Sequence, residues 1–188
     1  MLYTFLLWPL VALWDAVTLL IALPCAVILL TVRAFDFTTL PGLFQFLDKV
    51  PCGVALQRLL IRLCSPYAAT IRCEILQLTE TSCFVRMDDW PWLRNPFRSV
   101  HAVAIGNLAE LTSGLAMLSA LEGTALRGIP TRIDCHYLRK ARGRLLASCA
   151  LESPLAPGTY KCSVRVLNAQ MEKVCEASVE WCLKSMDD

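Results

Sequence analysis

Charged side chains are nearly absent from the first part of the chain. Asp15 is the only one between Met1 and Val32, and Arg33 ends the apolar stretch. No Lys or Arg precedes the stretch, it is too long for a secretory signal, and it has no small-residue cleavage pattern, so a removable signal is excluded. Residues 1–33 therefore form the predicted membrane anchor, either one tilted transmembrane helix or a re-entrant hairpin bent near Asp15.

Net charge and metal ligands are also scarce. The 188 residues carry a net charge of only +2, which is too small to indicate a nucleic-acid partner. None of the ten cysteines forms a C-x-x-C pair, so the sequence supports neither a zinc site nor a disulfide framework. We expect no bound metal, and thiols that behave as small buried hydrophobic groups in a reducing compartment.

The absence of Lys and Arg before Arg33 also predicts how the chain is oriented in the membrane. Because Arg33 is the first of them, the positive-inside rule places the following domain on the cytosolic side of the membrane. Residues 34–65 then form a juxtamembrane connector with a short helix at Cys52–Cys64, and residues 66–184 form the folded domain. Four phenylalanines give the connector an apolar side suited to the membrane surface: Phe35, Phe37, Phe44 and Phe46.

The folded domain combines strand patterns with one long apolar helix, Val100–Leu121, which is rich in small residues. Two strands are predicted before it, at Thr70–Leu78 and Ser82–Met87. A loop is predicted at Gly123–Pro130, and four strands after it, at Thr131–Leu138, Arg144–Leu151, Tyr160–Asn168 and Lys173–Leu183. This order predicts an α+β domain in which an antiparallel six-stranded sheet wraps around one long helix.

The start of that helix holds the most informative spacing. His101 stands at its first turn, and Glu110 follows nine residues later. At 3.6 residues per turn, nine steps rotate the chain by ~900°, so the two side chains point to opposite sides of the helix. One copy cannot close a site with both groups, whereas two antiparallel copies can. The spacing therefore predicts a dimeric site.

This arrangement resembles the hotdog fold, and residues 66–181 are similar to the hotdog-type acyl-CoA thioesterases. The similarity is closest to a branch of that superfamily known only as a domain of unknown function. The residues that carry it are Pro66-Tyr67, Asn95, the run from Val100 to Glu110, Gly114, Tyr137-Leu138 and Lys140-Ala141.

In PaaI-like relatives an Asn stands six residues before a His-Gly pair, and an acidic residue stands nine residues after the His. Asn95, His101 and Glu110 keep that spacing, and Ala102 replaces the Gly. The resemblance implies that the Ala102 N–H polarises a thioester carbonyl while Glu110 of the facing subunit attacks it or activates water. Free N–H groups at a helix start suit the negative charge that develops, and apolar neighbours raise the pKa of a carboxyl group.

A basic cluster between two predicted strands gives a candidate substrate contact: Arg139, Lys140, Arg142 and Arg144. A solvated turn is the default interpretation, and the resemblance implies contacts with the phosphates of coenzyme A. No cofactor is expected beyond the coenzyme A moiety of the substrate. The expected partners are an acyl-CoA or related acyl thioester, further copies of the chain in a homodimer or dimer of dimers, and membrane lipid.

The sequence thus indicates a membrane-anchored acyl-CoA hydrolase of the hotdog type. Two alternatives remain open. Because Ala102 stands in place of Gly, the protein could be a non-catalytic acyl- or lipid-binding protein that keeps the fold. It could also be a scaffold whose sheet edges bind another membrane protein.

The apolar first segment generates a direct test. The full chain should stay in the membrane pellet after high-pH carbonate extraction, and a chain lacking residues 1–33 should become soluble, because a span of this length is held by its apolar surface. Immunoblotting of pellet and supernatant measures the outcome. Release of the intact chain by carbonate would rule out an integral anchor.

Overall fold

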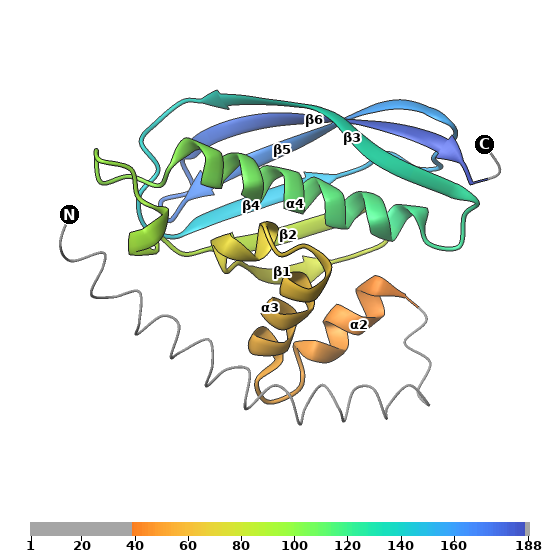
Figure 1. Ribbon diagram of the computed structural model, residues 1–188, viewed down its shortest axis with the longest axis horizontal. Helices are drawn as coiled ribbons and strands as arrows, with labels where there is room; N and C mark the ends of the chain where they lie inside the picture. Colours follow the sequence, from red (N-terminus) through yellow and green to blue (C-terminus); the bar gives the residue numbers. More distant parts are fainter. Residues whose placement is uncertain (1–38, 187–188) are drawn as a thin grey trace.

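The computed structural model describes residues 39–186 (Figure 1). The predicted membrane anchor, Phe35 and Phe37 lie outside the described residues. The elements in chain order are α2 (Leu40–Leu47), α3 (Gly53–Cys64), η2 (Ala68–Ile71), β1 (Glu74–Leu78), β2 (Ser82–Met87), η3 (Pro91–Leu93), α4 (Ala102–Leu121), β3 (Leu126–Tyr137), β4 (Leu145–Ala150), β5 (Gly158–Asn168) and β6 (Lys173–Ser185).

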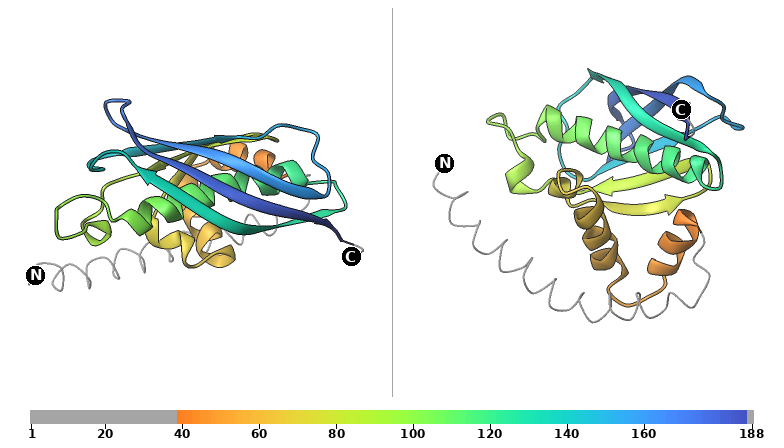
Figure 2. Two further views of the ribbon diagram at one scale, coloured as in Figure 1. Left: turned by 90° about the horizontal axis from the view of Figure 1, so that it is seen from above. Right: turned by 45° about the vertical axis from the view of Figure 1, so that its right-hand side comes forward.

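One six-stranded sheet organises the domain, in the order β1-β2-β4-β5-β6-β3. Every neighbouring pair in it is antiparallel. The sheet curves over α4, which lies along its inner face, while α2 and α3 sit beyond the β1 end (Figures 1 and 2). This arrangement confirms the predicted α+β hotdog fold.

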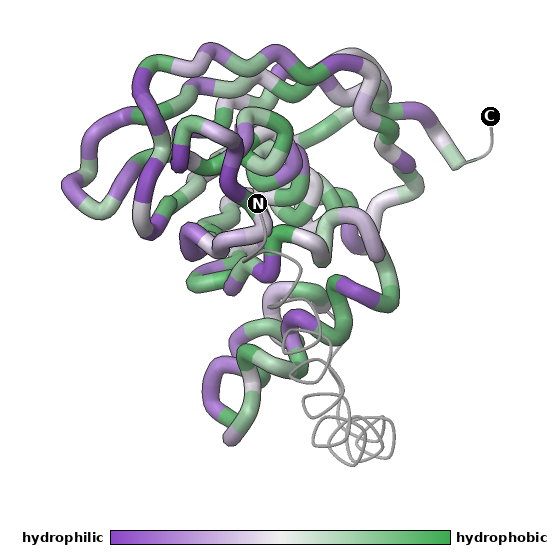
Figure 3. The backbone as a smooth tube through the Cα atoms, turned by 60° about the vertical axis from the view of Figure 1, so that its left-hand side comes forward, coloured by the Kyte–Doolittle hydropathy of each residue, from purple (hydrophilic) through white to green (hydrophobic). Residues whose placement is uncertain are grey.

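Strand alternation explains which side of the sheet meets α4. In β2, Cys83, Val85 and Met87 are buried while the residues between them are half-buried or exposed, and β4, β5 and β6 repeat the pattern. Hydrophobic and hydrophilic residues alternate accordingly along the chain (Figure 3). With a period of two, one face of each strand supplies the core and the other meets solvent.

The core helix α4 is apolar around most of its circumference. Leu108, Leu111 and Leu115 lie on one face and Met117 lies on the opposite face, and all four are buried. A helix of this type is stable only when it is enclosed. Among residues 39–186, α4 is the one helix long and apolar enough to cross a membrane, and here it forms the centre of the domain.

Two segment boundaries differ from the sequence expectations by four residues or more. β3 begins at Leu126, inside the predicted loop Gly123–Pro130, and it includes Pro130. A proline is tolerated there because β3 is the edge strand and its register shifts just after Pro130. At the other predicted boundary, Thr70 belongs to the 3₁₀ turn η2, and the first strand starts only at Glu74.

The connector helices pack onto the domain. Phe44 and Leu47 of α2 are buried in the common core, so the expectation that Phe44 faces a membrane surface is wrong. The Leu40 N–H donates to Glu122 Oε1 at the end of α4, at 2.6 Å. A carboxylate is favoured at this position because the first N–H groups of a helix lack intrahelical partners.

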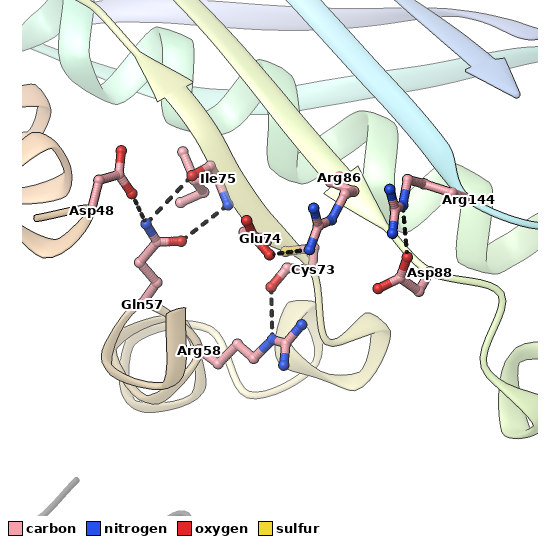
Figure 4. A network of polar contacts seen from close by, with 9 residues as sticks. All are labelled: Asp48, Gln57, Arg58, Cys73, Glu74, Ile75, Arg86, Asp88 and Arg144. Atoms are coloured by element: carbon pink, nitrogen blue, oxygen red, sulfur yellow. Dashed lines mark hydrogen bonds and ion pairs between the residues drawn. The ribbon is translucent and has the colours of Figure 1, made fainter. Parts of the chain in front are cut away.

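The outer edge of β1 is closed by side chains of α3 (Figure 4). The Ile75 N–H donates to Gln57 Oε1 (3.1 Å), and Gln57 Nε2 donates to the Ile75 carbonyl (3.4 Å) and to Asp48 Oδ1 (2.7 Å). Arg58 Nε donates to the Cys73 carbonyl at 3.1 Å. Gln57 is fully buried, so its amide takes the place of a neighbouring strand.

We expect Gln57→Leu to destabilise the fold, because it leaves the Ile75 N–H and carbonyl buried without partners. The expected loss is about 1–3 kcal/mol for each unpaired group. Urea denaturation followed by tryptophan fluorescence measures it. Gln77→Leu, at an exposed position of β1, is the matched control and should change stability by about 0.5 kcal/mol or less. Equal effects of the two substitutions would contradict the edge-closing role of Gln57.

Candidate active site at the start of the core helix

The loop before α4 is held by one side-chain oxygen. Asn95 Oδ1 accepts hydrogen bonds from the Phe97 N–H (3.0 Å), the Ser99 N–H (3.2 Å) and the Ser99 hydroxyl (3.1 Å). Arg98, within this loop, adopts a left-handed conformation with φ 56°. Asn95 therefore shapes the loop. Its amide nitrogen has no hydrogen bond within residues 39–186, so it stays available to a ligand.

His101 caps α4. Its backbone is extended (φ −63°, ψ 139°), and its Nδ1 accepts a hydrogen bond from the Val103 N–H at 3.2 Å. The His101 N–H donates to the Leu93 carbonyl at 2.7 Å, which fixes the entry of the chain into the helix. The helix consequently starts at Ala102, two residues later than the sequence pattern predicts. In this position His101 orients the first turn.

Ala102 presents an unused donor. Within the described part of the chain its N–H has no hydrogen-bond acceptor, and the residue is exposed at the first helical position. Its carbonyl accepts a hydrogen bond from the Tyr137 hydroxyl at 3.0 Å. The backbone there has ordinary helical dihedral angles, so the exchange of Gly for Ala causes no backbone strain.

Glu110 lies in the middle of α4 and is half-buried. Burial raises the pKa of its carboxyl group above the ordinary value of 4.5. The carboxylate makes no hydrogen bond or ion pair with any residue in 39–186. Its Oε1 lies close to Gly114, one turn further along the helix, and Gly114 in turn faces the indole ring of Trp181 from β6.

A single protomer does not bring the donor and the acid together. Ala102 and Glu110 are eight residues apart on one straight helix, which corresponds to ~12 Å along its axis. The side chains of His101 and Glu110 also point to opposite sides of this helix, because nine residues rotate the chain by two and a half turns. Within one copy the two groups stay apart, and a site shared between two copies stays a prediction.

The flank of α4 that carries Glu110 stays open to solvent. Val103 of α4 is 56% exposed, and Ile133 and Tyr137 of the edge strand β3 are 46% and 48% exposed. No described strand pairs with the second edge of β3. Apolar side chains beside an unpaired strand edge are typical of a surface that another chain covers.

The basic cluster lies close to the start of α4, and some of its side chains already have partners within the chain. The Val100 N–H donates to the Ala141 carbonyl, which places this loop beside the helix entry. Arg139 pairs with Glu172 at 2.6 Å, and Arg142 Nε donates to the Arg98 carbonyl at 3.2 Å. Lys140 is exposed and has no ion-pair partner within residues 39–186. Lys140 and the remaining N–H groups of the exposed Arg142 are therefore available for an anionic ligand.

A metal-ligand cluster or a surface hollow in residues 39–186 could mark a different functional site. Residues 39–186 contain no group of three or more His, Cys, Asp or Glu side chains placed to hold a metal ion. A hollow of about 590 Å³ lies on the outer face of the sheet and is lined by Phe84, Ser148 and Arg165 among others. None of the predicted site residues lines it, because its side chains point away from α4.

Sequence reasoning assigned no role at this site to Ser113, Trp181 or Tyr137, although Tyr137 is among the residues that carry the family resemblance. Trp181 donates from Nε1 to the Ser113 hydroxyl (3.3 Å), and Ser113 donates to the Glu110 carbonyl (2.9 Å). Tyr137 reaches Ala102 from β3. Trp181 and Tyr137 come from strands whose register with α4 is a tertiary property. For Trp181 the one available signal was that it is the large aromatic residue among small and aliphatic inward-facing residues of β6.

Comparison with known proteins assigns the family. The model of a domain of unknown function, DUF4442, matches residues 53–183. The chain belongs to the DUF4442 family. Among curated proteins, no sequence matches this chain.

Several solved structures share the fold of this DUF4442 protein. A protein of unknown function from Pseudomonas aeruginosa, titled "Probable Thioesterase", is 20% identical, with a TM-score of 0.63 over 72% of this chain and 97% of that one. A thioesterase from Haemophilus influenzae is 19% identical, with a TM-score of 0.60 over 69% and 90% of the two chains. A hypothetical thioesterase from Streptococcus pneumoniae with coenzyme A is 19% identical, with a TM-score of 0.53 over 60% and 86%. At these identities the likeness establishes the hotdog fold.

The raised pKa of Glu110 predicts how stability depends on pH. The native state holds this proton more tightly than the unfolded state, so the free energy of unfolding falls as the pH rises from 4.5 through the native pKa. Glu110→Gln is neutral at every pH and should be more stable than wild type near neutral pH. The two proteins should converge as the pH falls below 4.5.

Thermal unfolding of both proteins across this pH range measures the difference. Glu152→Gln, at an exposed position, controls for the loss of one negative charge. Parallel curves for Glu110→Gln and wild type would contradict the burial of this carboxyl group.

Proposed function

We propose that this protein is a hotdog-type hydrolase of acyl-CoA or a related acyl thioester, and that it acts as a homodimer. One observation carries the proposal. The half-buried Glu110 carboxyl has no partner in the described chain and lies on an open flank of the helix whose first N–H, that of Ala102, is also unused. An unpaired acid with a raised pKa and a free helix-start donor are the two groups that thioester hydrolysis needs.

The chemistry follows from these two groups. The Ala102 N–H donates to the thioester carbonyl oxygen and stabilises the negative charge that develops there. Glu110 of the facing subunit takes a proton from the attacking water, the C–S bond of the tetrahedral intermediate breaks, and the same proton passes to the leaving thiolate, which gives the free acid and the coenzyme A thiol. In the alternative route Glu110 attacks the carbonyl carbon itself, coenzyme A leaves as the thiolate and takes a proton from water, and a second water hydrolyses the resulting anhydride. His101 keeps the first turn of α4 in place, and Asn95 holds the loop before it while its free amide binds water or substrate.

The substrate proposal is supported by two features. The fold is shared with a hypothetical thioesterase from Streptococcus pneumoniae that was solved with coenzyme A. In this chain Arg139, Lys140 and Arg142 lie beside the helix entry, where they could pair with coenzyme A phosphates. Lys140 is the strongest candidate, because Arg139 is already paired with Glu172.

The cellular setting is part of the same proposal. Residues 1–33 anchor the protein in a membrane by a single span or a re-entrant hairpin, and the hotdog domain faces the cytosol. Membrane lipid would then be a partner. A dimer of dimers is compatible with the same site, because only one facing subunit is needed to complete it.

A specific observation favours one alternative. The Ala102 methyl group is exposed at the point where a thioester carbonyl would approach. If it obstructs that approach, the protein binds acyl-CoA or lipid without hydrolysing it, or serves as a hotdog scaffold for another membrane protein. Measurable acyl-CoA binding without any thiol release would select the binding function.

The proposed role of Glu110 predicts a large kinetic effect. Glu110→Gln keeps the size of the side chain but cannot accept a proton, so thiol release from acyl-CoA should fall by ~10²–10⁴-fold. His101→Ala should cost less, because His101 orients the helix start. Ala102→Gly should be tolerated or should raise the rate. Thiol release at equal folded concentration is the measurement, and equal rates for wild type and Glu110→Gln would remove Glu110 from the mechanism.

Subunit mixing tests whether the site is shared. Ala102→Pro removes only the donor N–H, because proline is favoured at the first helical position and His101 already has the extended backbone required before it. Alone, Ala102→Pro and Glu110→Gln should both be nearly inactive. When equal amounts are unfolded and refolded together, the mixed dimers hold one intact site, and activity should return to about a quarter of wild type if chains pair at random. Absence of recovery despite mixed dimers would show that one chain supplies both groups.

A further inference from the structure

The Tyr137 hydroxyl ties the first turn of α4 to the sheet. It donates to the Ala102 carbonyl at 3.0 Å. Tyr137 is the last residue of β3, and this strand pairs with β6 from Leu126 as far as Tyr137, which lies opposite Cys175. The phenol therefore extends from a fixed point of the sheet to the residue that carries the unused donor N–H.

The hydrogen bond to Ala102 acts along the helix axis. In an α-helix the carbonyl groups point toward the C-terminal end and the N–H groups toward the N-terminal end. A bond at the Ala102 carbonyl thus leaves the N–H of the same residue free, while it fixes how the first turn stands relative to β3. The oxygen has two lone pairs, so the helical bond from the N–H four residues later is kept.

Gly106 leaves space for the phenol on the open flank of α4. A methyl group placed on Gly106 would stand 3.9 Å from the Tyr137 hydroxyl and 3.8 Å from Cys135 Sγ. The Tyr137 side chain is 48% exposed, so the ring lies outside the core. Ala102, Gly106 and Glu110 follow one another at a spacing of four residues, which places the phenol on the flank that leads to the proposed acid.

The other contacts of the first turn come from the loop before it. The His101 N–H donates to the Leu93 carbonyl at 2.7 Å, and the Val103 N–H donates to His101 Nδ1 at 3.2 Å. Helix ends fray, and a donor to a developing oxyanion works only at a defined distance from it. The Tyr137 hydroxyl adds a support for this turn that comes from the sheet.

We propose that Tyr137 is a positioning residue for thioester hydrolysis: its hydroxyl holds the first turn of α4 where the Ala102 N–H meets the carbonyl oxygen of the substrate. This inference rests on the proposed function, since it takes that N–H as the donor. Tyr137 does not touch the reacting atoms. Small displacements of a group that stabilises a transition state are costly, so the loss of one hydroxyl group should be visible in the rate.

Tyr137→Phe removes the hydroxyl group and keeps the ring. In the full-length protein, kcat for acyl-CoA hydrolysis should fall by roughly 5- to 50-fold, which is less than the ~10²–10³-fold loss expected when an oxyanion donor is removed outright. KM should change by at most about threefold, because the donor binds the developing charge more strongly than the ground-state carbonyl. Thiol release at a series of acyl-CoA concentrations gives both constants.

Tyr160→Phe is the matched control. The Tyr160 hydroxyl accepts a hydrogen bond from the Ala156 N–H at 2.9 Å, so this substitution also removes one structural hydrogen bond. Tyr160 pairs with Trp181 of β6, whereas Tyr137 pairs with Cys175, which places the two tyrosines ~20 Å apart along that strand. Tyr160→Phe should leave kcat and KM unchanged, even if it lowers Tm as much as Tyr137→Phe does.

A double substitution tests whether Tyr137 acts through the Ala102 N–H. Ala102→Pro lacks this N–H, so adding Tyr137→Phe to it should cost no further activity. Two independent effects would multiply instead. The residual rates of the single and double variants are compared at equal folded concentration.

Binding measurements test the same role without turnover. A ketone analogue of acyl-CoA, in which CH₂ replaces the thioester sulfur, keeps the carbonyl group, and an alkyl thioether of coenzyme A lacks it. In calorimetric titrations Tyr137→Phe should weaken binding of the ketone by roughly 2- to 5-fold, the usual effect of one weakened hydrogen bond. It should leave binding of the thioether unchanged.

The possible failures are distinct. If wild type hydrolyses acyl-CoA but Tyr137→Phe behaves like Tyr160→Phe, or multiplies with Ala102→Pro, the positioning role is overturned while the hydrolase proposal stands. If wild type hydrolyses no acyl-CoA but Tyr137→Phe weakens only the ketone, the hydrolase proposal fails and the positioning role stands. If there is no hydrolysis and the two analogues respond alike or do not bind, both are overturned.

Discussion

The enclosure of α4 by the sheet is the constraint on which the rest of this structure depends. A helix surrounded on nearly all sides must satisfy its polar groups internally. The Thr112 hydroxyl accordingly donates to the Leu108 carbonyl at 2.6 Å, and Asn107 Nδ2 donates to the Tyr67 carbonyl at 3.2 Å. What remains accessible on this helix is its first turn and the flank toward β3. The candidate chemistry, Ala102 and Glu110, lies in those two places.

The polar residues near the start of α4 divide into two groups. Asn95 Oδ1 and His101 Nδ1 form hydrogen bonds within the chain that build the loop and the cap. The Ala102 N–H and the Glu110 carboxylate form none in residues 39–186. A half-buried carboxyl group without a partner is costly to ionise, which distinguishes Glu110 from Asn95 and His101. The buried Ser119 hydroxyl of α4 also lacks a partner in the described chain, but it carries no charge.

The sequence was sufficient to predict the architecture, because local sequence patterns indicated the strands and the core helix. Runs rich in apolar residues between turn signals marked β2, β4, β5 and β6, and the small-residue helix was placed within two residues. The strand that begins at Leu126 was missed because Pro130 reads as a turn signal, and only its edge position makes it tolerable. The burial of Phe44, the closing of the β1 edge by Gln57, and the placing of Trp181 beside Gly114 depend on contacts between segments far apart in sequence. No local pattern contains that information.

The two ends of the sheet are unequal, and this limits how many copies can join. A sheet with free backbone groups at both ends can add strands without limit, which leads to open-ended filaments. Here Gln57 occupies the outward N–H and carbonyl of Ile75, so strand addition is blocked at β1. The β3 end remains available, and two such ends that pair consume each other. In the proposed homodimer, growth by strand pairing would therefore stop at two copies, because a glutamine on a helix far from β3 closes the other edge of the sheet.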